Sequence, residues 1–112
     1  MTTVEVLKKA RELLARDGWT KYALARDAGG HIAHLSDPDA AKFCAAGAIK
    51  RVAWDAYDGY GELFASAVAA VEARCHGASI TYMNDTAFGV EFVLARFDEA
   101  IHALEGANEA TS

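Results

Sequence analysis

Cys44 is the residue of this sequence most suited to covalent chemistry, and His31 and Asp85 are the partners that it would need. A thiol attacks as a thiolate, so a cysteine nucleophile requires a helix N-terminus or an imidazole to lower its pKa, and a third group to orient the imidazole. Such a set would make the protein a hydrolase or a transferase. Alanine, glycine and phenylalanine flank Cys44, however, and a thiol buried among such residues is inert. We therefore expect a packing residue and keep the enzyme as the alternative.

The histidines and cysteines show none of the usual metal-ligand spacings. His31 and His34 are expected on one arm of a β-hairpin, where their side chains would point to opposite faces. Cys75 and His76 are adjacent at a predicted helix end, where neighbours rarely bind one ion. Motifs for phosphate loops and nucleophile elbows are also missing. The sequence therefore predicts neither a metal site nor a cofactor.

Length and composition indicate one globular domain. The chain has 112 residues, of which 53% are hydrophobic and 24% are charged. No apolar stretch reaches the ~18 residues that a membrane helix needs, and the N-terminus lacks the pattern of a signal peptide. We expect a cytoplasmic protein that contacts no membrane, with its domain over residues 1–106 and a frayed tail over residues 107–112.

The net charge of −5 is unevenly distributed along the chain. Residues 1–56 carry 9 basic and 7 acidic groups, whereas residues 57–112 carry 2 basic and 9 acidic groups. Proteins that bind nucleic acid usually present a basic face, but the basic residues near this N-terminus alternate with acidic ones. The charge pattern therefore predicts no nucleic-acid partner, and the asymmetry suits the meeting of two protein surfaces.

Hydrophobic periodicity predicts four helices, which lie at about residues 2–17, 37–54, 61–75 and 84–105. Thr2 and Glu5 have the spacing of a capping box, and Asp17 with Gly18 ends the first helix. The second helix starts at Asp37 and is apolar nearly all round, which is typical of the buried centre of a fold.

Residues 20–34 lose the helical period and predict a β-hairpin around the turn residues 27–30. Ile80 and Tyr82 are expected in a short extended stretch, and residues 84–86 should cap the last helix. The sequence thus predicts a mostly helical α+β domain, in which four helices surround the central helix and the hairpin packs on one side.

The last predicted helix has two apolar sides, and the second one carries Phe88 and Phe92. Either the hairpin or the turn at residues 57–61 covers these rings, or they form a protein contact. A symmetric homodimer is the simplest contact, and the core of a chain with 25 alanines, which has few large side chains, would gain from it.

A shallow ligand pocket is a further prediction. Tyr57, Tyr60 and Tyr82 would line it beside Trp54, because the glycines of the intervening loop allow a ligand to approach closely.

Three short motifs resemble those of a known family. They are Trp19-Thr20, Cys44-Ala45-Ala46-Gly47-Ala48, and Asn84-Asp85 before the last helix. In this order they resemble a family of small uncharacterised proteins of bacteria and phages, classed only as a domain of unknown function. Met83 stands where that family has a tryptophan, with Tyr82 one place earlier. The resemblance covers most of the chain and implies no known activity.

The function that these observations favour is a non-enzymatic protein-binding or interaction module that self-associates. The alternative is the hydrolase or transferase that uses Cys44. A bacterial or phage regulator that acts on a host protein is compatible with the acidic second half of the chain.

Overall fold

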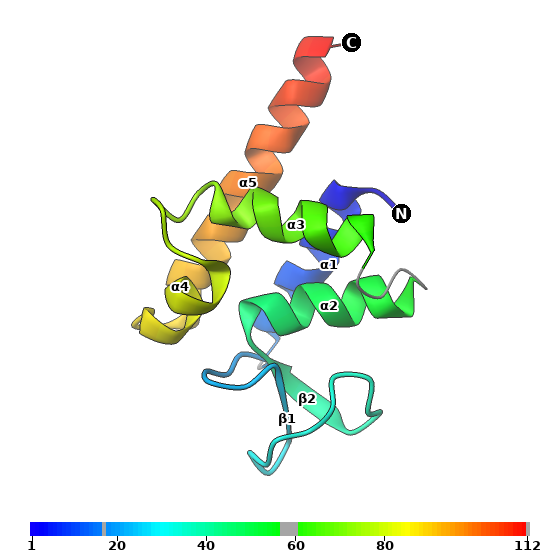
Figure 1. The fold of residues 1–112 in the computed structure, drawn as a ribbon, viewed down its shortest axis with the longest axis vertical. Coiled ribbons are helices and arrows are strands. Elements are labelled where there is room, and N and C mark those ends of the chain that lie inside the picture. The colour runs from blue at the N-terminus through cyan, green and yellow to red at the C-terminus, as the bar shows by residue number, and fades with distance from the viewer. Residues whose placement is uncertain (17, 57–60, 112) are drawn as a thin grey trace.

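The computed structural model describes residues 1–16, 18–56 and 61–111, and this part of the chain forms five helices and two short strands (Figure 1). The elements are α1 (Thr3–Ala15), β1 (Ala25–Asp27), β2 (Ala40–Phe43), α2 (Ala45–Asp55), α3 (Glu62–Glu72), α4 (Ile80–Thr86) and α5 (Val90–Thr111). The predicted class, a mostly helical α+β fold, is confirmed. The described part has five helices instead of four, because a segment predicted as extended is helical.

Helix α1 begins at the predicted capping box. The Glu5 amide donates to Thr2 Oγ1 over 3.2 Å, and the Thr2 amide donates to Glu5 Oε1 over 3.0 Å. One face of α1 is buried and contributes Val6, Leu7 and Leu14 to the core. Asp17, one of the two residues predicted to end this helix, lies outside the described residues.

Four helices enclose the core. Helix α1 packs on α2, α3 and α5, and the C-terminal part of α5 extends beyond the rest of the molecule (Figure 1). Nearly every residue of α2 from Ala45 to Ala53 is buried, so its interior position is as predicted. A pair of bonds from the Arg11 guanidinium to the Asp98 carboxylate joins α1 to α5 on the outside.

The start of the central helix is a correction. Asp37 opens a turn instead of a helix, since its Oδ1 accepts the Asp39 amide over 2.8 Å. The chain then enters β2, which pairs antiparallel with β1 so that Ala25 lies opposite Phe43. Helix α2 therefore begins at Ala45, eight residues later than predicted.

The predicted hairpin over residues 20–34 is right in its turn and wrong in its second strand. The Gly30 amide donates to the Asp27 carbonyl over 3.0 Å, and Gly30 takes a φ of 89° that favours glycine. The returning chain meets β1 only at a single bridge between Arg26 and Ile32. Residues 40–43 supply the strand that pairs with β1 instead.

Helix α4 replaces the predicted extended stretch. Ser79 caps it by accepting the Tyr82 amide over 3.1 Å. Asn84 and Asp85 consequently lie inside α4 and do not cap the last helix. Helix α5 starts only at Val90 and continues to Thr111, into the segment predicted as a frayed tail.

Candidate functional site

Asn84 is completely buried and joins three segments that are distant in sequence. Its Oδ1 accepts the indole N–H of Trp19 and the amide of Ala45, each over 2.9 Å. Its Nδ2 donates to the Thr20 carbonyl and to Asp85 Oδ1, each over 3.1 Å. All four hydrogen-bonding positions of the side-chain amide are therefore used. This junction fixes α4 against the start of α2 and against the loop that follows α1.

Asp85 extends the junction to Tyr22. Its Oδ1 accepts the Tyr22 amide over 3.0 Å, and the Tyr22 hydroxyl donates to the Asp85 carbonyl over 3.3 Å. Tyr22 has a φ of 64°, a left-handed conformation that is uncommon for a residue with a large side chain. The two bonds to Asp85 hold Tyr22 in this conformation.

Cys44 is the N-cap of α2, and its Sγ accepts the Gly47 amide over 3.3 Å. The side chain is buried, and burial raises the pKa of the thiol above its usual value. The amides of Gly47 and Ala46 act in the opposite direction, while the Asp85 carboxylate raises the pKa further. The predicted helix over residues 37–54 would have placed Cys44 inside the helix, and this position was wrong. Burial still outweighs the effect of the helix N-terminus on the pKa and keeps this thiol protonated at neutral pH.

Gly47 is needed for the contact between α2 and the strand region. A Cβ built on Gly47 would lie 2.0 Å from the carbonyl oxygen of Leu24. The same oxygen accepts the amide of Cys44 over 3.3 Å. The three motifs of the sequence therefore meet at one place, where they set the packing of α2, α4 and the segment that precedes β1.

A surface pocket of about 360 Å³ opens beside this junction. Its lining residues are Tyr22, Ala23, Leu24, Cys44, Thr81 and Asp85. Two of the three residues of the alternative catalytic set, Cys44 and Asp85, thus share one pocket.

His31, the third member of that set, lies elsewhere. It follows the hairpin turn with 83% of its side chain exposed, and its Nδ1 is 3.4 Å from Asp27 Oδ1. None of the described residues that line the pocket of Cys44 is a histidine. The described residues also contain no group of three His, Cys, Asp or Glu side chains arranged to hold a metal ion.

Only two members of the predicted aromatic pocket, Trp54 and Tyr82, are among the described residues, and they do not lie together. Trp54 lies at the C-terminal end of α2 and is 45% exposed, whereas Tyr82 is on α4, which contacts the other end of α2 at Ala45. Nine residues of helix separate the two ends, or roughly 14 Å of rise. Tyr57 and Tyr60 lie outside the described residues.

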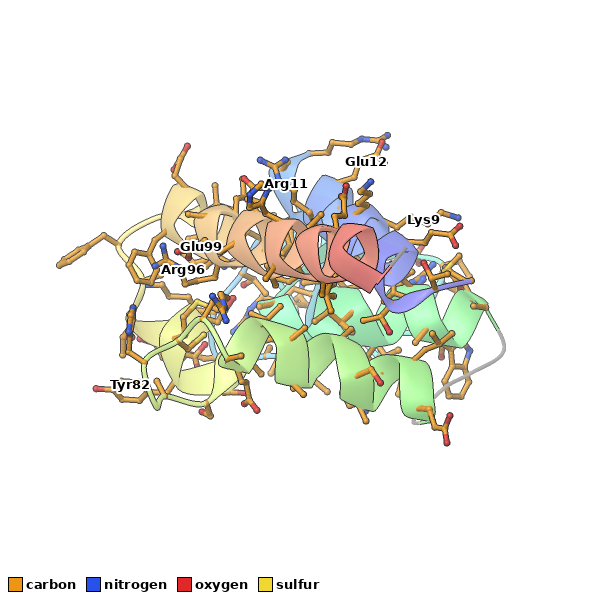
Figure 2. The ribbon with its side chains drawn as sticks, turned by 90° about the horizontal axis from the view of Figure 1, so that it is seen from above. Lys9, Arg11, Glu12, Tyr82, Arg96 and Glu99 are labelled. Atoms are coloured by element: carbon orange, nitrogen blue, oxygen red, sulfur yellow. The ribbon has the colours of Figure 1, made fainter. Side chains whose placement is uncertain are left out.

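Phe88 lies in the segment between α4 and α5 and not on the last helix as predicted, because α5 starts only at Val90. Phe88 is fully exposed, and Phe92, in the first turn of α5, is 48% exposed. None of the described residues therefore covers the Phe88 ring. The Arg96 guanidinium lies over the Phe92 ring, 4.5 Å from its centroid, and Figure 2 shows Arg96 beside Glu99 on α5. Tyr82 is 64% exposed and points away from the body of the molecule in the same view.

Sequence reasoning identified the motif residues but missed the role of Asn84 and the position of Tyr22. The available signal was chemical, because a buried tryptophan needs a partner for its indole N–H. That partner lies 65 residues further along the chain, and spacing alone does not reveal such a pair.

The fold and the junction define a small, mostly helical α+β domain whose short motifs hold its helices together around one buried asparagine. This chain belongs to a family of unknown function (DUF6197), whose model matches residues 1–103. The predicted resemblance to a domain of unknown function is therefore confirmed. No curated protein and no solved structure was found to match this chain.

In the part of the chain that the structure describes, none of the helices combines the length and the apolar character required to span a membrane.

Proposed function

We propose that this protein is a non-enzymatic interaction module that self-associates through an aromatic surface made of Phe88 and Phe92. The observation that carries this proposal is the complete exposure of Phe88. Burying a phenylalanine side chain is worth about 1.5–3 kcal/mol, and this ring gains nothing from the described residues of its own chain. A second copy of the chain supplies the missing contact in the simplest way.

The residues around Phe88 suit a protein contact. Phe92 lies four residues further along the chain, in the first turn of α5, and the Arg96 guanidinium lies over its ring. Aromatic and arginine side chains dominate the binding energy of many interfaces. Tyr82 adds a third exposed aromatic ring on the preceding helix. Two phenylalanines bury about 150–250 Å² each, whereas a stable interface needs about 800 Å² per partner. The proposed interface therefore extends beyond the aromatic surface onto its polar surroundings.

The test is sedimentation equilibrium from low to high micromolar protein, with Phe88→Ala as the variant. We expect the wild type to show a dimer whose fraction rises with concentration. Because a symmetric interface contains Phe88 twice, the substitution should weaken the dimer by about 100-fold or more. It should leave the fold unchanged, since the ring contacts no core.

Ile32→Ala is the matched control, because Ile32 is 74% exposed but follows the hairpin turn. This control should dimerise like the wild type. A wild-type protein that stays monomeric at the highest concentration would overturn the proposal.

A further inference from the structure

We propose that the pocket beside the junction binds a primary ammonium group carried on a short apolar chain. The pocket is called here the α4 pocket and comprises Tyr22, Ala23, Leu24, Cys44, Thr81 and Asp85. Its volume of about 360 Å³ is within the range of small-molecule sites. This inference is independent of self-association and concerns a different surface.

The sign of the ligand charge follows from the residues that line the α4 pocket. Asp85 carries the negative charge, and none of the described residues in the lining is basic. The start of α2 would otherwise attract an anion, but two of the amide donors in its first turn are occupied. The Ala45 amide donates to Asn84, and the Gly47 amide donates to the Cys44 sulfur. An anion would meet the carboxylate without gaining these donors, so a cation is favoured.

The carboxylate of Asp85 is held in place before any ligand arrives. Both the Tyr22 amide and Asn84 Nδ2 donate to its Oδ1. Asn84 is itself completely buried and is bound to Trp19 and Ala45. A charged group fixed by a buried network binds a partner with little loss of side-chain entropy.

The other residues define the rest of the ligand. Thr81 precedes Asp85 by one helical turn, so its hydroxyl lies on the same side of α4 and can accept a hydrogen bond from an ammonium group. Ala23, Leu24 and the buried thiol of Cys44 provide an apolar wall. A head with several N–H donors and a chain of a few methylenes therefore matches the α4 pocket. A free alkylamine and the side chain of a lysine share this chemistry.

The first experiment is an NMR titration of the ¹⁵N-labelled protein with n-butylammonium, and with n-butanol and butyrate as neutral and anionic analogues. We expect saturable shifts of the Tyr22, Leu24 and Asp85 amides with butylammonium, and binding of the two analogues about tenfold weaker or less. Equal binding of all three probes, or no saturable shift with butylammonium, would overturn the proposal.

The matched variants are Asp85→Asn and Asp39→Asn. Asp85→Asn keeps an oxygen that can accept the Tyr22 amide but removes the charge, so butylammonium should bind about tenfold more weakly. Asp39 is an exposed carboxylate on the turn before β2, and its substitution should change nothing. If both variants bind like the wild type, the site is not the α4 pocket.

Protection of Cys44 gives a second and independent measurement. In a Cys75→Ser protein, a small thiol-specific reagent such as methyl methanethiosulfonate reaches only Cys44. Saturating butylammonium should slow this reaction severalfold at mildly alkaline pH, and butyrate should not. An unchanged rate would place the amine elsewhere.

Two further measurements distinguish the possible sources of the ammonium group and test the amine site independently of self-association. The affinity of Nα-acetyl-lysine methylamide is compared with that of butylammonium. Much tighter binding of the lysine derivative indicates a lysine of a protein partner, and similar affinities indicate a free amine. Phe88→Ala should bind butylammonium like the wild type. A wild type that binds butylammonium but stays monomeric contradicts self-association alone, and one that dimerises but does not bind butylammonium contradicts the amine site alone.

Discussion

At the residue scale, Cys44 shows how two opposing influences on one thiol are resolved. The amides at the start of α2 favour the thiolate, while burial and the Asp85 carboxylate disfavour it more strongly. A thiol with a raised pKa is a poor nucleophile near neutral pH. The enzyme alternative also lacks its base, since His31 pairs with Asp27 after the hairpin turn.

The reactivity of Cys44 is therefore predicted to be low. In folded Cys75→Ser protein, alkylation of Cys44 should be slower than that of a free thiol and should rise only above pH ~8.5. Because the pKa is raised in the folded state, the unfolded chain ionises first, and stability should fall as the pH rises from ~8.5 towards the folded pKa. Alkylation rates and urea unfolding between pH 7 and 10 measure both effects, with Cys44→Ala in the same background as control. Rapid alkylation well below pH 8 would contradict this prediction and favour the alternative of a cysteine-dependent enzyme.

At the element scale, local signals predicted the helices well where no distant partner competed. The capping box of α1 and the apolar character of α2 are both present as predicted. Asp37-Pro38 is a strong signal for a helix start, yet residues 40–43 form a strand because β1 offers them a partner. Pairing with a strand thirteen or more residues away is a tertiary effect that overrides local propensity. The α4 pocket and the Asn84 junction also depend on contacts between residues that are distant in sequence.

The close contact between α2 and Leu24 predicts the behaviour of Gly47→Ala. Alanine favours a helix over glycine by about 1 kcal/mol, but the new methyl group would overlap the Leu24 carbonyl. We expect a net loss of about 1–3 kcal/mol in the free energy of unfolding, measured by urea denaturation. Gly106→Ala is the control, since nothing lies within 4 Å of its added Cβ on α5, and it should stabilise the protein slightly. Equal effects of the two substitutions would show that α2 can move away from Leu24.

At the scale of the whole molecule, the distribution of charge bears on how two copies would meet. Exposed ion pairs between α1 and α5 neutralise part of the acidic second half, since Arg11 pairs with Asp98 and Lys8 with Glu105. Around the aromatic surface, Arg96 is paired with Glu99, and the exposed Glu91 lies beside Phe92. A symmetric contact through Phe88 and Phe92 would thus bring two surfaces of the same negative sign together.

The salt dependence of self-association follows from this arrangement. Screening shortens the reach of surface charges from about 10 Å at 0.1 M salt to about 3 Å at 1 M, so added NaCl should strengthen a symmetric dimer. Glu91→Gln should strengthen it at low salt and reduce the salt effect, because the substitution removes one repelling charge from each copy. Sedimentation equilibrium at several NaCl concentrations measures both changes, and Phe88→Ala should remain monomeric throughout. A dimer that weakens with salt would instead indicate attraction between the basic first half of one copy and the acidic second half of another, a head-to-tail contact that need not stop at two chains.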